Sequence, residues 1–113
     1  MLTVEQLRNY GANVDEALKR CMNNEGFYLR LVKKAMQDPY CDQLKEAIEA
    51  KDFDRAFELA HALKGVAGNL SLTPLYNPVS EITELLRSRT DTDYSSLLAE
   101  ILEKKDELQA LIQ

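Results

Sequence analysis

The chain has 113 residues, a formal net charge of −5 and 29% charged residues, which together describe one ordinary globular domain. The acidic balance disfavours nucleic-acid backbones and anionic membrane surfaces as partners. No apolar run in the sequence approaches the roughly 18 residues needed to span a bilayer. We therefore expect neither nucleic-acid binding nor membrane insertion.

The N-terminal part of the chain predicts three helices. Thr3 begins a capping-box pattern for a short first helix. Asn13 suits the N-cap of a second short helix that extends to Arg20. A third helix, with apolar residues at helical spacing, is expected to begin at Asn23 or Asn24.

The middle of the chain predicts two longer helices. Asp38 suits an N-cap and Pro39 suits the first helical position of a helix that runs to about Lys51. The next helix is expected from Asp52 to about Ser71.

Two prolines complicate the segment that follows. Thr73 and Pro74 open it, but Pro78 has no backbone N–H and would crowd the carbonyl of Pro74. We therefore predict an irregular or bent first turn and regular helix from Pro78 to about Arg87. A final helix, capped near residues 92–93, carries an apolar stripe of six residues: Leu97, Leu98, Ile101, Leu102, Leu108 and Leu111.

The connections between these segments are short, which favours antiparallel packing of consecutive long helices. The sequence thus predicts an all-α fold, an up-and-down antiparallel four-helix bundle whose two short N-terminal helices cap one end. We expect a single domain over residues 1–113, and a monomer.

Cysteine and histidine usage limits the redox and metal chemistry. Cys21 and Cys41 share no metal-ligand spacing with each other or with the single histidine, His61. A disulfide framework in so short an extracellular chain normally uses more cysteines. The first residues also lack a basic stretch followed by an apolar one. We therefore expect a cytoplasmic protein with reduced thiols, no metal site and no cofactor.

Residues 53–70 carry the most informative pattern. On a helical wheel, His61 lies far from the apolar face, and Lys64, Gly65 and Gly68 follow it at three, four and seven positions. Phe57 lies one turn before it. The apolar face itself is contiguous and must be buried: it consists of Ala56, Ala60, Leu63, Ala67 and Leu70.

The two glycines need a reason, because a glycine inside a helix costs about 0.5–1 kcal/mol relative to alanine. Gly65 and Gly68 lie beside His61 on the outer face, so the absence of their side chains would let a partner surface approach the imidazole. Lys64 supplies a cation for an anion on the ring. Phosphoryl transfer needs such a site, because positioning and electrostatics carry most of its catalysis. Close helix packing is the alternative role for the glycines, although they lie off the apolar face.

The ten-residue stretch that begins at His61, His-Ala-Leu-Lys-Gly-Val-Ala-Gly-Asn-Leu, resembles the signature of histidine phosphotransfer (HPt) domains, and the chain is similar to their stand-alone bacterial type. The resemblance implies that a receiver domain or a histidine kinase phosphorylates Nε2 of His61, and that the phosphoryl group is exchanged with the aspartate of receiver domains. It implies electrostatic support from Lys64 and partner access over Gly65, Gly68 and Phe57. Mg²⁺ and the acidic pocket belong to the receiver, so the chain is expected to be a phosphoryl carrier rather than an enzyme.

Two residues depart from the family pattern. Ser71 stands where many members have glycine, ten residues after the histidine, and Pro78 interrupts a segment that is usually smoothly helical. Both are weak hints of an alternative: a helical bundle that binds a receiver or another partner without being phosphorylated. Such a module would have no need to retain His61. A bundle that dimerises through an exposed stripe is a third possibility.

Overall fold

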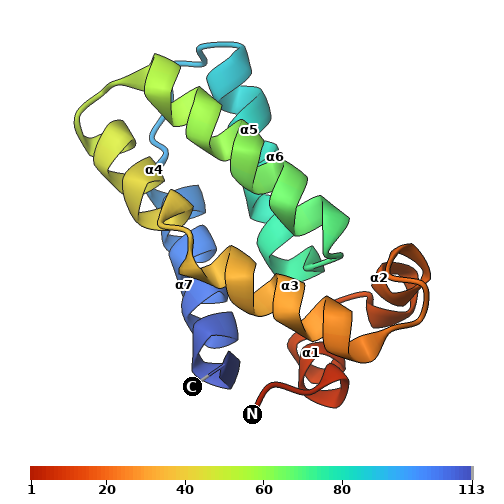
Figure 1. Cartoon of the computed structure of the whole chain (residues 1–113). Helices are drawn as coiled ribbons and strands as arrows, with labels where there is room; N and C mark the ends of the chain where they lie inside the picture. Colours follow the sequence, from red (N-terminus) through yellow and green to blue (C-terminus); the bar gives the residue numbers. More distant parts are fainter. Residues whose placement is uncertain (113) are drawn as a thin grey trace.

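The computed structural model describes residues 1–112, and its architecture is entirely helical within that range, which confirms the predicted fold class (Figure 1). The helices are α1 (Val4–Tyr10), α2 (Val14–Arg20), α3 (Glu25–Gln37), α4 (Tyr40–Glu49), α5 (Phe53–Asn69), α6 (Thr73–Arg87) and α7 (Ser95–Ile112). Each of these helices is too short or too polar to cross a membrane.

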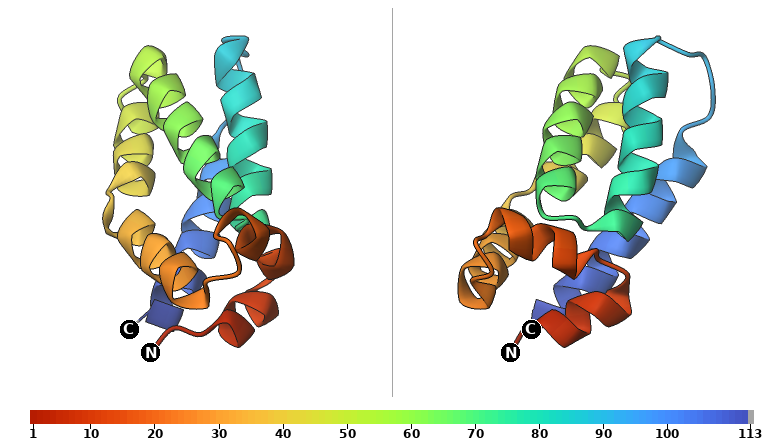
Figure 2. Two further views of the ribbon diagram at one scale, coloured as in Figure 1. Left: turned by 45° about the vertical axis from the view of Figure 1, so that its right-hand side comes forward. Right: turned by 90° about the vertical axis from the view of Figure 1, so that its right-hand side faces the viewer.

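Helices α4 to α7 pack around a shared core, and α5 has two neighbours among them. Helix α5 lies against both α4 and α6, while α6 also packs against α7, and a smaller contact joins α4 to α7. Helices α5 and α6 run in opposite directions side by side in all views (Figures 1 and 2). The shared core contains the apolar face of α5, all five members of which are buried as predicted.

The three N-terminal helices gather at one end of the α5–α6 pair (Figure 2). Helix α1 packs on α7, where the Tyr10 hydroxyl donates a hydrogen bond to the Lys104 carbonyl at 2.9 Å. Helix α2 lies at the end of α5, and both chain termini lie at this same end (Figure 1). The N-terminal segment is therefore tied to the longer helices at two separate places.

Helix starts follow the sequence closely at four positions. Thr3 forms the predicted capping box, and the side chains of Asn13, Asn24 and Asp52 each accept a backbone N–H in the first turn of α2, α3 and α5. The Asp93 carboxylate likewise accepts the Ser95 N–H at the start of α7, at 2.9 Å. These bonds satisfy donors that a helix cannot satisfy internally.

The predicted cap at Asp38 is wrong. Asp38 instead closes α3, since its N–H donates to the Ala35 carbonyl at 3.3 Å, and α4 begins at Tyr40 without a side-chain cap. The backbone of Asp38 is extended (φ −74°, ψ 136°), as expected for a residue that precedes proline. Pro39 occupies the N-cap rather than the first helical position.

The irregular turn predicted before Pro78 is also wrong, because α6 is helical from Thr73 onward. Its first turn is regular: the Tyr76 N–H donates to the Leu72 carbonyl at 2.8 Å. Pro78 removes one main-chain hydrogen bond, but its fixed φ suits a helix. Burial of Pro78 and Val79 supplies apolar contacts that offset this single loss.

Candidate functional site

His61 lies near the middle of α5 and its side chain is exposed, as predicted. Its neighbours Ala60 and Leu63 are buried in the core. Successive side chains on a helix are rotated by about 100°. Because the Ala60 and Leu63 side chains point into the core, the imidazole of His61 lies on the opposite side of the helix and faces solvent. A partner can therefore reach the ring without any change in the packing of α5.

An aromatic and cationic layer flanks the imidazole on the side of the α5 N-terminus. The Phe57 ring stacks on the His61 ring, with centroids 5.8 Å apart and planes 20° from parallel. The guanidinium carbons of Arg87 and Arg89 lie 5.0 and 5.8 Å from the Phe57 centroid, within range of cation–π attraction. Arg89 is also paired with Asp54 of α5. Phe57 thus supports the imidazole and is itself partly covered.

An open depression of about 310 Å³ adjoins His61 on the other side. It is lined by six residues of α5 and α6: His61, Lys64, Gly65, Gly68, Asn69 and Tyr76. The structure therefore places three of the four predicted neighbours of His61, the lysine and both glycines, around one hollow.

The two glycines play different structural parts. A Cβ added at Gly65 would meet no atom within 4 Å, so this position leaves open space beside His61. A Cβ at Gly68 would lie 3.1 Å from Cε1 of Tyr76, so Gly68 also permits the close approach of α6. Helix packing, the alternative considered from the sequence, therefore applies to Gly68 and not to Gly65.

Lys64 is engaged by a residue that sequence reasoning missed. Its ammonium nitrogen lies 3.5 Å from Oε1 of Glu84 on α6, and 27% of the side chain is exposed. Oε2 of the same carboxylate accepts from Nε of Arg87 at 3.1 Å. Desolvation acts to raise the pKa of Glu84, but Arg87 and Lys64 outweigh it and lower that pKa. Lys64 is thus an ion-paired cation at the edge of the depression.

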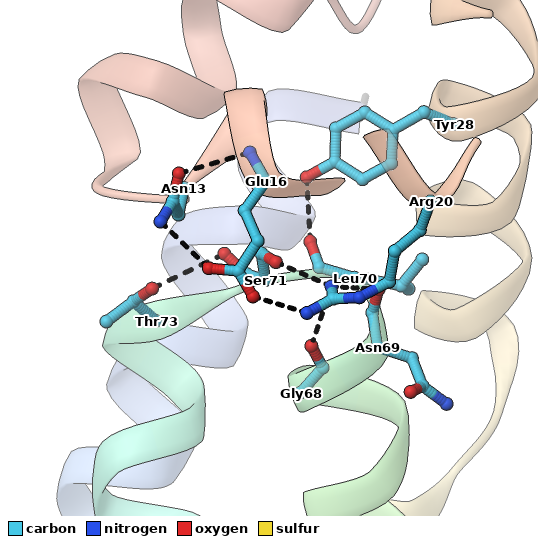
Figure 3. A network of polar contacts seen from close by, with 9 residues as sticks. All are labelled: Asn13, Glu16, Arg20, Tyr28, Gly68, Asn69, Leu70, Ser71 and Thr73. Carbon is cyan, nitrogen blue, oxygen red and sulfur yellow. Dashed lines mark hydrogen bonds and ion pairs between the residues drawn. The ribbon is translucent and has the colours of Figure 1, made fainter. Parts of the chain in front are cut away.

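The C-terminal end of α5 is held by the side chain of Arg20 from α2 (Figure 3). The guanidinium also pairs with Glu16. It donates to three oxygen atoms at this end: the carbonyls of Gly68 (3.3 Å) and Asn69 (2.9 Å), and the Ser71 hydroxyl (2.9 Å). A cation at this position satisfies carbonyls that the helix leaves unpaired and complements the negative end of its dipole.

Ser71 has a left-handed backbone, with φ of 55°. Its N–H bonds back to Gly68 and that of Leu72 bonds back to Ala67, at 3.2 and 2.9 Å, which is the Schellman ending of a helix. Glycine is favoured at this position because it has no Cβ to strain. Serine keeps the left-handed backbone here, and its hydroxyl accepts a hydrogen bond from Arg20. The departure from the family pattern at Ser71 therefore concerns the end of α5.

The sequence carried only weak signals for the partners that the other helices bring to this site. Glu84, Arg87 and Arg89 have ordinary surface spacing, and Tyr76 reads as a core residue. No group of three or more metal-binding side chains occurs among residues 1–112.

Comparison with protein families gives one match: the Hpt domain model covers residues 29–113, more than half of the chain. Comparisons with curated proteins and with solved structures found no match. An exposed histidine on a core helix, beside a lysine and an open glycine, agrees with the family's chemistry. The chain therefore belongs to the Hpt domain family, whose members are phosphoryl-carrying modules of two-component phosphorelays.

Proposed function

We propose that the chain accepts a phosphoryl group on His61 and exchanges it with the aspartate of response-regulator receiver domains. The observation that carries the proposal is the position of the chain's single histidine: it is exposed on a packed helix, beside an open depression. A histidine kinase is the other candidate donor. The family match supports this function for the fold as a whole.

The transfer step uses the lone pair of Nε2 of a neutral imidazole. A phosphorus–nitrogen bond forms while the bond between phosphorus and the receiver's carboxylate oxygen breaks, and the aspartate leaves as a carboxylate. The ring proton stays on Nδ1 throughout the step, so the reverse step releases a neutral imidazole. The reverse reaction passes the group onward, so the chain is a carrier whose chemistry is completed by its partner.

The neighbouring residues take distinct roles in this proposal. Lys64 offsets the charge of the phosphoryl group, and Gly65 leaves room for the partner's reacting loop. Gly68 extends that room while it accommodates Tyr76. Phe57 holds one face of the imidazole, so the ring is oriented before the partner arrives.

We further propose one domain over residues 1–113, with α4 to α7 as an up-and-down antiparallel four-helix bundle. Two hydrogen bonds support a single domain: Arg20 bonds to the end of α5, and Tyr10 bonds to α7. They attach residues 1–28, which precede the family match, to the helices within that match. A monomer in the cytoplasm fits this function.

The test is phosphoryl transfer from a panel of ³²P-labelled, phospho-aspartyl receiver domains to this chain, with His61→Gln alongside. Acid-labile, base-stable label that is lost in the variant is the expected result. Circular dichroism of both proteins establishes that they are folded. If the folded protein takes no label from any receiver or kinase of its own genome, the proposal is rejected in favour of binding without phosphorylation.

A further inference from the structure

One carboxylate at the site lies between two cations. Glu84 contacts the Lys64 ammonium with Oε1 at 3.5 Å and the Arg87 guanidinium with Oε2 at 3.1 Å. All three side chains are partly exposed. Lys64 also lines the depression beside His61, which lies one helical turn earlier on α5.

We propose that Glu84 is a positioning residue that holds the Lys64 ammonium next to His61 and yields it to the phosphoryl group. This inference rests on the proposed phosphorylation of His61. It assigns a function in the transfer equilibrium to a residue of α6.

The exchange of partners follows from charge. A protein-bound phosphoryl group carries about −1.5 to −2 charges near neutral pH, more than the single charge of a carboxylate, so it attracts the ammonium more strongly at equal distance. Residues three apart on a helix are neighbours, which places the Lys64 side chain within reach of a group on His61.

Glu84 keeps one ion-pair partner when Lys64 is released. Its second oxygen keeps the Arg87 guanidinium, one turn further along α6. Exposed ion pairs are also weak, so the pair with Lys64 is readily exchanged. In the resting protein, the ion pair with Glu84 keeps the Lys64 side chain at the edge of the depression that His61 lines.

The same arrangement makes Glu84 a competitor for Lys64. Removal of its charge is expected to shift the transfer equilibrium toward phospho-His61, by about 1.5- to 5-fold, the range that corresponds to one exposed ion pair. Part of any such shift would come from lower repulsion of the phosphoryl group. The other part of the shift comes from competition between Glu84 and the phosphoryl group for Lys64, and only this part should disappear when Lys64 is absent.

The experiment is a double-mutant cycle on the equilibrium between phospho-receiver and phospho-His61, with wild type, Glu84→Gln, Lys64→Ala and the double variant. Glu81→Gln is the matched control, because Glu81 is exposed on the same helix and forms no ion pair within the described residues. Circular dichroism establishes that each variant is folded.

The expected result is a shift toward phospho-His61 for Glu84→Gln that is larger with Lys64 than without it, and that shrinks at high salt. An equal shift in both lysine backgrounds, or the same shift for Glu81→Gln, would overturn the inference alone. A folded wild type that takes no label would overturn the proposed function, and this inference with it.

Discussion

Replacement of Arg20 by alanine should loosen the helix that carries His61 without changing any side chain that lines the depression beside it. The guanidinium is the one side chain among residues 1–112 that bonds both the Gly68 and the Asn69 carbonyls at the end of α5. It also holds the hydroxyl of Ser71, whose left-handed backbone terminates the helix. Arg20→Ala removes all of these bonds together with a cation at the negative end of the helix dipole.

The size of the effect follows from the exposure of the contact. A buried hydrogen bond contributes about 0.5–1.5 kcal/mol, but 44% of the Arg20 side chain is exposed, so water can replace it at the freed carbonyls. Each bond then counts near the low end of that range. A cation near a helix C-terminus adds about 0.3–1 kcal/mol. With three bonds lost, we expect Arg20→Ala to lower the free energy of unfolding by about 2–2.5 kcal/mol.

Urea unfolding followed by circular dichroism measures this change, because the midpoint shifts while the slope stays constant for a pure stability effect. Lys19→Ala is the matched control, since Lys19 is an exposed cation on the same helix whose side chain forms no hydrogen bond or ion pair within the described residues. Arg20→Lys keeps the charge but not the forked donors and should fall between wild type and alanine. If Arg20→Ala is no less stable than Lys19→Ala, the clamp does not stabilise α5 and the reasoning fails.

Three further predictions concern single positions and pH. Gly65→Ala should raise the free energy of unfolding by about 0.5–1 kcal/mol. Gly65→Phe should leave the protein folded but slow phosphoryl transfer to His61 about tenfold or more. Undiminished transfer in a folded Gly65→Phe protein would contradict the role of Gly65 in access to His61. Lys51 has φ of 58° after the end of α4, so Lys51→Gly should stabilise the protein by about 0.5–1 kcal/mol in thermal unfolding, and a lower melting temperature would argue against strain there. Burial raises the pKa of Cys41 from 9.0 to about 11 and that of Tyr28 from 10.0 to about 12. As pH rises, the unfolded chain loses these protons before the folded protein does, so the free energy of unfolding should fall between about pH 9 and 12. A flat profile over that range would show that neither group is buried as described.

Local signals in the sequence were sufficient for most of the helices and for the orientation of His61. Caps such as those at Thr3, Asn13 and Asp52 act over three residues, and the position of an apolar face depends only on helical periodicity. The two errors have different causes: at Asp38 the backbone preference of a residue before proline prevailed over its capping preference, and at Pro78 burial in the core retained the helix. An extended residue before proline closed one helix, and a buried proline was retained inside another.

The partners of the site residues were decided by tertiary structure alone. Glu84 meets Lys64, and Tyr76 meets Gly68, only because α6 packs against α5 at a particular rotation and height. Arg20 reaches the end of α5 from about fifty residues away in the chain. Hydrophobic periodicity states which face of a helix is buried, but the offset between two packed helices depends on how their side chains interdigitate. The sequence therefore determined that His61 lies on the exposed face of α5, while the packing of α6 against α5 determined which charges surround it.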